Sequence, residues 1–159
     1  MSFPAEYESR GTLGWRLFFR ALYRLLRLLD PLLRWWWHSG TLGLARSVDV
    51  VVPGRRSGRA RRILVTLLTV DGVGYVGHPN GQAPWIRNIE AAESFELAFA
   101  DRRRSRVRAV CLHAGPEREA VIRATWTQQP FPGDVIYSLA RNHIRTVGIY
   151  FRLVDVAEP

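Results

Sequence analysis

The chain has 159 residues, which suffices for one domain with a sizeable hydrophobic core and excludes two full enzymatic domains. Its formal net charge is +9 and all 23 basic residues are arginines, so we expect an anionic partner, because guanidinium groups stay charged and bind phosphate or carboxylate through paired hydrogen bonds. Cys111 is the only cysteine and the histidines lack metal-ligand spacing, which argues against an intrachain disulfide or a metal site and is compatible with a cytoplasmic protein.

The first predicted element is a basic amphipathic helix over residues 13–29. Its four arginines recur at spacings of four, four and three residues and therefore form one stripe: Arg16, Arg20, Arg24 and Arg27. Large apolar side chains occupy most of the remaining circumference, which is unusual for a solvent-facing helix. Pro31 interrupts the pattern, and the run Trp35-Trp36-Trp37 follows it. We treat residues 1–46 as an N-terminal helical segment and residues 47–159 as the cofactor-binding domain.

Two interpretations of this helix remain open. A transmembrane span is disfavoured, because each arginine costs roughly 2.5–3.5 kcal/mol near the bilayer centre. A cleaved signal peptide is disfavoured because the apolar stretch contains arginines and lacks a small-residue cleavage site. Residues 13–37 either lie on an anionic membrane surface, at the inner face of the cell membrane, or pack their apolar side on the barrel or on a second subunit of a homodimer.

From Ser47 onward the pattern changes to short β-branched runs separated by turns. Six strands are predicted, over residues 48–52, 62–70, 73–77, 94–100, 105–113 and 147–156. Helices are predicted from Pro84, from residue 116 to about 126, and from residue 133 to about 142. Mostly antiparallel strands with inserted helices favour an α+β, closed or partly closed barrel. Neither GxGxxG nor GxxxxGK[ST] follows a strand, which argues against a Rossmann or P-loop fold.

An arginine-rich turn joins the first two predicted strands over residues 53–62. It carries five arginines around two glycines, together with the Ser57 hydroxyl. Backbone N–H groups, this hydroxyl and several guanidinium groups could converge there on one phosphate. The alternative is an ordinary solvated hairpin tip.

A second loop, residues 77–89, follows the third predicted strand. Asn80-Gly81 supplies a tight turn and Pro84 begins a helix. On that helix we expect Trp85 and Ile89 to point inward and Arg87 and Asn88 to face elsewhere.

The two segments together resemble the deazaflavin-dependent nitroreductase and quinone reductase family. The first reads G-R-R-S-G-x-x-R from Gly54, and the second reads G-x-P-N-G-x-x-P-W-x-R-N-I from Gly77, with two strands between them. The resemblance covers residues 47–156. It implies a split β-barrel of the flavin-reductase and pyridoxamine-phosphate-oxidase type that binds coenzyme F-420, an 8-hydroxy-5-deazaflavin with a phosphate and a glutamate tail. The reduced coenzyme would deliver hydride to a small hydrophobic quinone, nitro compound or activated alkene; the alternative cofactor is FMN.

The same resemblance implies roles for individual residues. The phosphate and tail would be held by Arg55, Arg56, Ser57 and Arg61. The ring-side pocket would be lined by Gly77, His78, Asn80, Gly81, Trp85 and Asn88. Hydride transfer needs no protein nucleophile, so the expected catalytic contribution is a hydrogen-bond donor to the substrate. Tyr137 is the first choice because family members carry tyrosines in this region, with His78 and His143 as alternatives.

Two other functions compete with this hypothesis. A barrel of this type could be a non-catalytic carrier of a lipid, haem or flavin. A nucleic-acid-binding module is suggested by net charge and by the run Arg102-Arg103-Arg104-Ser105-Arg106. Because no recognition helix or RNA-binding motif accompanies that run, we expect no nucleic-acid partner.

Overall fold

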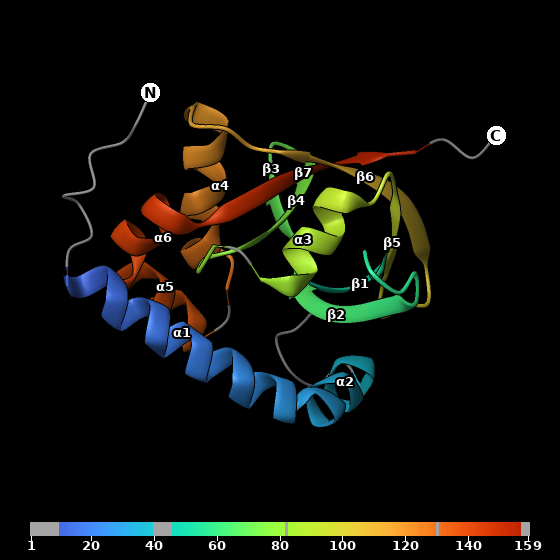
Figure 1. Cartoon of the computed structure of the whole chain (residues 1–159), viewed down its shortest axis with the longest axis horizontal. Helices are drawn as coiled ribbons and strands as arrows, with labels where there is room; N and C mark the ends of the chain where they lie inside the picture. The colour runs from blue at the N-terminus through green and yellow to red at the C-terminus, as the bar shows by residue number, and fades with distance from the viewer. Residues whose placement is uncertain (1–9, 40–45, 82, 130, 157–159) are drawn as a thin grey trace.

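The computed structural model describes residues 10–39, 46–81, 83–129 and 131–156, without the side chains of residues 10–12 and 36–39. A curled, wholly antiparallel sheet of seven strands, in the order β2-β1-β5-β6-β7-β4-β3, forms its centre (Figure 1). The strands are β1 (Ser47–Pro53), β2 (Ala60–Thr66), β3 (Leu68–Val70), β4 (Val73–His78), β5 (Phe95–Ala98), β6 (Arg104–Cys111) and β7 (Ile149–Asp155). The α+β split β-barrel expected from the sequence is confirmed.

The predicted second strand, residues 62–70, is divided in two. The β2 segment pairs with β1, with Ser47 opposite Thr66, whereas β3 pairs with β4, with Leu68 opposite Tyr75. The chain changes partner at Leu67, whose N–H donates to the Arg46 carbonyl oxygen at 2.8 Å. The prediction of six strands was therefore wrong by one, because an apolar run does not reveal where a strand leaves one neighbour for another.

Six helices are described, and they surround the sheet (Figure 1). They are α1 (Arg10–Leu28), α2 (Asp30–Ser39), α3 (Pro84–Ala91), α4 (Pro116–Thr127), α5 (Gly133–Leu139) and α6 (Arg141–Val147). Proline occupies the first turn of α3 and α4, where its missing N–H costs no helical hydrogen bond. The helix predicted over 133–142 is two helices that extend to Val147, so the last strand begins at Ile149.

Two apolar cores stabilise the fold, one on each side of the sheet's curl. The first joins the barrel strands to α3 and contains Val48, Val50, Val52, Val76, Ile86, Ile89, Phe95, Leu97, Val107 and Phe151. The second joins the sheet to the helices and contains Phe19, Leu68, Tyr75, Val121, Ile122, Ala124, Ala140, Ile144 and Tyr150. Full burial of a phenylalanine side chain such as Phe19 contributes about 1.5–3 kcal/mol, so α1 is held firmly on the domain.

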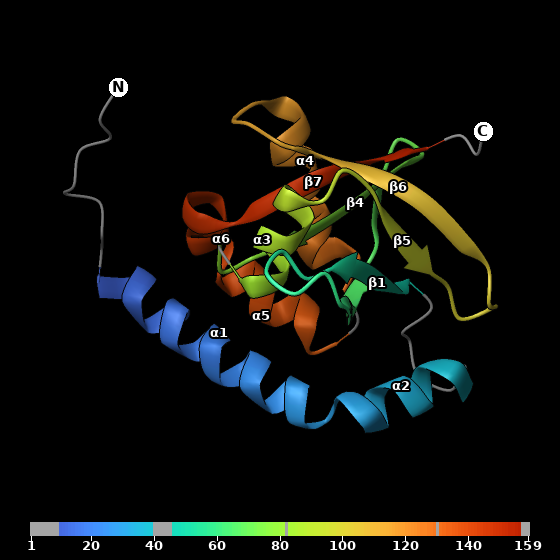
Figure 2. The ribbon, with the colours of Figure 1, turned by 45° about the vertical axis from the view of Figure 1, so that its right-hand side comes forward.

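The N-terminal helices lie along one side of the domain, with α1 beside α5 and α2 below the β1–β2 edge (Figures 1 and 2). Phe19 of α1 stacks on Tyr137 and on His143, each with a 5.8 Å centroid separation. The interruption expected at Pro31 is confirmed, because α1 ends at Leu28 and α2 begins at Asp30 with Pro31 in its first turn. Asp30, in the same turn, accepts a 2.7 Å hydrogen bond from Arg34 Nε, which stabilises that end of α2.

The outward side of α1 and α2 remains apolar and exposed. Its exposed large side chains are Leu13, Leu17, Phe18, Leu25, Leu28, Leu29, Leu32 and Trp35. No described helix combines the length and the hydropathy that a membrane crossing requires. The helix thus buries one side on the domain through Phe19 and leaves a second apolar side uncovered.

Candidate functional site

A large cavity of about 1620 Å³ lies between α1, the β2 strand with its preceding turn, and the loop after β4. Its wall includes every residue that the sequence assigned to cofactor binding, and Tyr137 as well. These residues are Arg55, Arg56, Ser57, Arg61, Gly77, His78, Asn80, Gly81, Trp85 and Asn88. Two separate segments of the sequence, residues 53–62 and 77–89, therefore meet at one site.

The backbone of the turn between β1 and β2 is folded on itself. Gly54 carbonyl oxygen accepts hydrogen bonds from the N–H groups of Ser57 and Gly58, at 3.1 and 2.7 Å. Gly58 has a φ of 65°, a left-handed conformation that favours glycine. The N–H of Arg59 donates to Ser57 Oγ at 3.4 Å. Since these three backbone donors already have acceptors, an anion at this turn would be bound by the arginine side chains.

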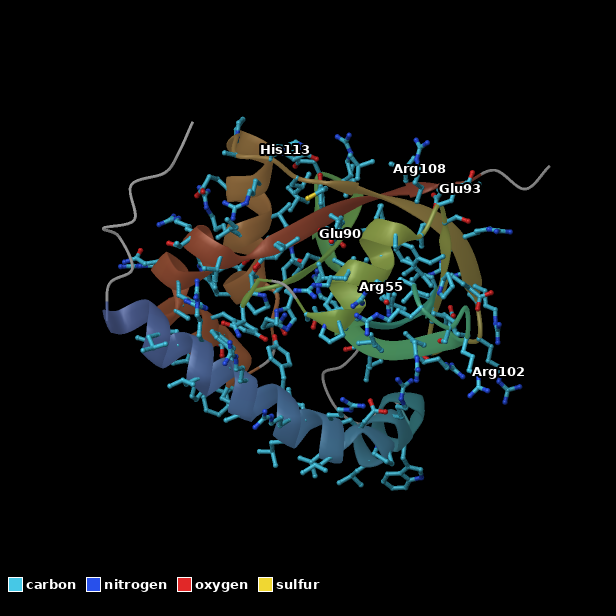
Figure 3. All side chains as sticks on the ribbon, viewed as in Figure 1. Arg55, Glu90, Glu93, Arg102, Arg108 and His113 are labelled. Carbon is cyan, nitrogen blue, oxygen red and sulfur yellow. The ribbon has the colours of Figure 1, made fainter. Side chains whose placement is uncertain are left out.

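Arg55 and Asn88 join the turn to α3. The Arg55 backbone N–H and its side-chain NH1 both donate to Asn88 Oδ1, each at 3.3 Å, and NH1 also donates to the Pro84 carbonyl oxygen at 3.3 Å. Asn88 is buried, and Arg55 lies beside α3 in the middle of the molecule, whereas Arg102 and Arg108 lie at its edge (Figure 3). Asn88 thus orients the turn that carries Arg55 and Arg56.

His78 lies at the other end of the predicted site, in an aromatic environment. Its ring centroid is 4.5 Å from that of Tyr23 and 5.9 Å from that of Trp85. Burial lowers the pKa of His78 to about 4, so the imidazole is neutral at neutral pH. Its Nδ1 accepts a hydrogen bond from the Asn80 N–H at 3.2 Å, which leaves the ring proton on Nε2.

Asn80 connects the loop after β4 to two helices. Its Oδ1 lies 2.9 Å from His143 Nε2, and its Nδ2 donates to the Arg16 carbonyl oxygen of α1 at 3.4 Å. His143 does not border the cavity, and burial, followed by the charge of Arg16, lowers its pKa. Of the three predicted hydrogen-bond donors, His78 and Tyr137 border the cavity directly. His143 reaches it only through its contact with Asn80.

Tyr137 approaches the cavity from α5 and meets a tyrosine of α1. Its hydroxyl oxygen is 3.4 Å from that of Tyr23. Burial raises the pKa of Tyr137, and burial together with the neighbouring Tyr137 raises the pKa of Tyr23 well above its usual value. Both phenols therefore stay protonated at neutral pH and can act as hydrogen-bond donors.

Close packing explains why positions 77 and 81 are occupied by glycine. A Cβ on Gly77 would collide with the Tyr150 ring and would lie 2.7 Å from the Ile149 carbonyl oxygen. Gly81 has a φ of 77°, and a Cβ there would lie 2.7 Å from the Val147 carbonyl oxygen. These positions require glycine whether or not a ligand binds.

The sequence analysis did not assign the α1 residues to this cavity. Its wall includes Tyr23 and the four arginines of the α1 stripe, Arg16, Arg20, Arg24 and Arg27. Their helical spacing is the signal that places them on one face, but a stripe facing lipid and a stripe facing a cavity have the same spacing. Among the described residues no group of three or more His, Cys, Asp or Glu side chains is arranged to hold a metal ion.

The chain matches no protein-family model and no curated protein sequence. It is similar to the solved structure of conserved hypothetical protein Rv2991 from Mycobacterium tuberculosis, with a TM-score of 0.53, 11% identity, and coverage of 72% of this chain and 76% of that one. A structure described as a domain-swapped dimer has a TM-score of 0.50 at 16% identity, with 84% and 99% of the two chains covered. A structure described as an F-420-H2-dependent reductase (FDR-A) has a TM-score of 0.47 at 16% identity, with 67% and 93% covered. The likeness to the first two structures, at TM-scores of 0.53 and 0.50, establishes a shared fold and leaves the ligand to be argued from the site.

Proposed function

We propose that this protein is a deazaflavin-dependent reductase that binds coenzyme F-420 in the cavity beside α3 and transfers hydride to a small hydrophobic acceptor. One observation carries the proposal: the ten predicted cofactor residues and Tyr137 border one cavity. Chance alone would scatter residues from a turn, a loop and a late helix over the surface of a barrel.

The size and charge of the cavity fit the coenzyme. Sites for drug-sized ligands measure roughly 300–1,000 Å³, so about 1620 Å³ leaves room for a cofactor and a second molecule. The guanidinium groups of Arg56 and Arg61 have no hydrogen-bond or ion-pair partner among the described residues. Their guanidinium groups are therefore available to a phosphate or carboxylate, which a polyanionic coenzyme supplies.

The chain's own residues would orient the reactants and donate hydrogen bonds. When bound, the reduced coenzyme supplies the hydride. One end of the cavity is lined by three rings, those of His78, Trp85 and Tyr23. The planar ring system of the coenzyme could stack there. Tyr137 would donate its phenolic hydrogen to the substrate oxygen that gains charge, and the neutral His78 Nε2–H is the alternative donor.

Equilibrium titration with oxidised coenzyme F-420 tests binding. We expect the wild-type chain to bind it and the Arg56→Ala and Arg61→Ala variants each to bind about tenfold more weakly, since a charge-assisted hydrogen bond contributes about 1.5–3 kcal/mol. Arg108→Ala, an exposed arginine at the far edge, is the matched control and should keep wild-type affinity. Absence of coenzyme binding to the wild-type chain would refute the proposal, whereas preferential binding of FMN would redirect it to a flavin enzyme.

Turnover separates a reductase from a carrier. Menadione added to the reduced complex should restore the absorbance band of the oxidised coenzyme in the presence of the wild-type chain. We expect Tyr137→Phe to lower kcat by about tenfold or more with little change in coenzyme affinity, because a transition-state hydrogen bond is lost. Tight binding without any acceleration over free coenzyme would indicate a carrier.

We also propose that the exposed apolar side of α1 and α2 rests on an anionic membrane. Eight large apolar side chains are exposed along these two helices, and the chain carries a net charge of +9 that attracts anionic headgroups. Since α1 also forms one wall of the cavity, a lipid-soluble quinone would reach the site from the same side. This arrangement favours quinones among the acceptors.

A further inference from the structure

The arginine stripe of α1 faces the same cavity as the arginine-rich turn. Arg20, Arg24 and Arg27 border the cavity from α1, while Arg55 and Arg56 border it from the turn before β2 and Arg61 from β2 itself. The sequence pattern had suggested that lipid headgroups contact the α1 stripe. In the structure the stripe borders the cavity, whereas none of the exposed leucines of α1 lies on the cavity wall.

The charge of this cavity is strongly unbalanced. Eight arginines border it, and among the described residues Asp30 is the only acidic side chain on its wall. Asp30 is already bonded to Arg34 at 2.7 Å. A cleft lined by one sign of charge concentrates the electrostatic field and attracts oppositely charged ligands.

Three of the α1 arginines, Arg20, Arg24 and Arg27, have side chains without a partner among the described residues, in contrast to the structural arginines nearby. Arg34 and Arg62 both bind Asp49. The side chains of Arg20, Arg24 and Arg27 make no hydrogen bond or ion pair with any described residue. Their donors are therefore free to bind a ligand.

Packing on both sides of these arginines holds α1 in place. Phe19, directly before Arg20, is fully buried, and the ring of Tyr23, between Arg20 and Arg24, lies 4.5 Å from that of His78. Beyond the stripe, Arg34 of α2 binds Asp49 of β1 at 2.8 Å. The stripe from Arg20 to Arg27 spans about 10 Å at 1.5 Å per residue, long enough to contact several carboxylates of an extended chain.

We propose that Arg20, Arg24 and Arg27 form a second anion subsite, which binds the carboxylates of an extended acidic tail whose phosphate lies at the turn. The subsite faces the turn across the cavity, so the acidic chain lies between α1 and β2. The identity of the ligand rests on the proposed function, whereas the subsite itself follows from the unpaired arginines.

A labelled hexaglutamate peptide tests the subsite without the coenzyme. We expect the full chain to bind this peptide and the combined Arg20→Gln, Arg24→Gln and Arg27→Gln variant to bind it about tenfold or more weakly. The matched control changes three exposed arginines elsewhere, Arg102→Gln, Arg108→Gln and Arg123→Gln, and so removes the same net charge. The control should stay within about threefold of wild type, since distant surface charges are screened. No binding to the wild-type chain, or equal losses in the two variants, would overturn the subsite.

Coenzyme F-420 with short and long glutamate tails tests the link to the proposed function. The wild-type chain should bind the long-tailed form more tightly, and the α1 triple variant should lose this preference. Arg56→Gln should weaken both forms equally. Coenzyme binding with the same tail preference in wild type and triple variant would overturn the subsite and leave the reductase proposal intact. No coenzyme binding at all would overturn the reductase proposal, while the peptide result would still decide the subsite.

Discussion

Arg34 of α2 and Asp49 of β1 form an ion pair in which NH1 lies 2.8 Å from Oδ2 and the carboxylate is fully buried. Arg62 of β2 binds the same oxygen at 2.7 Å. The pair thus joins the N-terminal helices to the edge of the barrel and holds α1 over the cavity. Buried carboxylates are costly unless they are paired, so this contact sets where α2 can dock.

Arg34→Met should therefore destabilise the fold. We expect the free energy of unfolding to fall by about 1.5–3 kcal/mol, since a hydrogen bond to a buried charge is lost while Arg62 remains. Arg145→Met removes a half-exposed ion pair with Glu119 and should cost less than about 1 kcal/mol. Denaturant unfolding of both variants measures the difference. Equal losses would show that the Arg34–Asp49 contact is no stronger than a surface pair.

Gly77→Ala should disturb the site through the barrel. The added methyl group would collide with the Tyr150 ring, and overpacking of this kind costs about 1–3 kcal/mol. Gly14→Ala is the matched control, because nothing lies within 4 Å of its Cβ position on α1. Replacing a helical glycine there should stabilise the chain by about 0.5–1 kcal/mol. Thermal unfolding should move in opposite directions for the two variants.

His78 should make the stability pH-dependent. Burial lowers its folded-state pKa from 6.5 to about 4. The unfolded chain therefore binds a proton at higher pH than the folded chain, and the free energy of unfolding falls as the pH decreases from 6.5 towards 4. Between pH 6.5 and 5 this loss is about 1.5 kcal/mol for His78 alone.

The His78→Gln variant isolates this contribution. Its free energy of unfolding should fall less steeply than that of wild type over the same pH interval. His143, whose pKa is lowered in the same direction, stays in both proteins and does not affect the comparison. His113→Gln, which removes an exposed imidazole, serves as the control. Identical pH slopes for wild type and His78→Gln would contradict the burial of a neutral His78.

Asn88→Ala should loosen the arginine-rich turn. It removes the acceptor of two hydrogen bonds from Arg55, so we expect a loss of about 1–2 kcal/mol in stability and faster hydrogen exchange at the Arg55 amide. Asn142→Ala, at an exposed position on α6, should leave both unchanged. Unaltered exchange at Arg55 in the first variant would mean that Asn88 does not orient the turn.

The combined Leu25→Glu and Leu28→Glu variant tests the membrane proposal without uncovering the core. Leu28 is 79% exposed, so the fold should persist, whereas deletion of the segment would remove buried Phe19. We expect the wild-type chain to sediment with anionic liposomes and the variant to sediment at least about fivefold less, since each leucine contributes about 1.5–3 kcal/mol on burial.

Val156→Glu, directly after β7, provides the control for the liposome experiment and should sediment like wild type. Gel filtration of the same proteins tests the alternative that a second copy of the chain, rather than a membrane, covers the apolar side of α1 and α2. A wild-type dimer that becomes monomeric in the leucine variant, with no liposome binding in either, would assign the apolar side to a second copy of the chain.

Local patterns in the sequence were sufficient for most of the barrel. β-branched runs placed the strands, Asp71-Gly72 placed the β3–β4 turn, and prolines placed the starts of α3 and α4, because each of these signals depends on neighbouring residues alone. The two motif segments were also recognisable as one unit. Their meeting at a single cavity required the sheet to bring the turn before β2 and the loop after β4 together.

Long-range contacts decided the rest. Helical periodicity put the four α1 arginines on one face, but what that face meets depends on α1 docking through Phe19, Tyr23 and the Arg34–Asp49 pair. Tyr23 meets Tyr137 across 114 residues of sequence, a contact that no local pattern encodes. Periodicity specifies which side chains share a face, whereas only tertiary packing specifies what each face contacts. The sequence pattern of the arginine stripe is therefore compatible with a lipid surface, but in the fold the stripe borders the cavity.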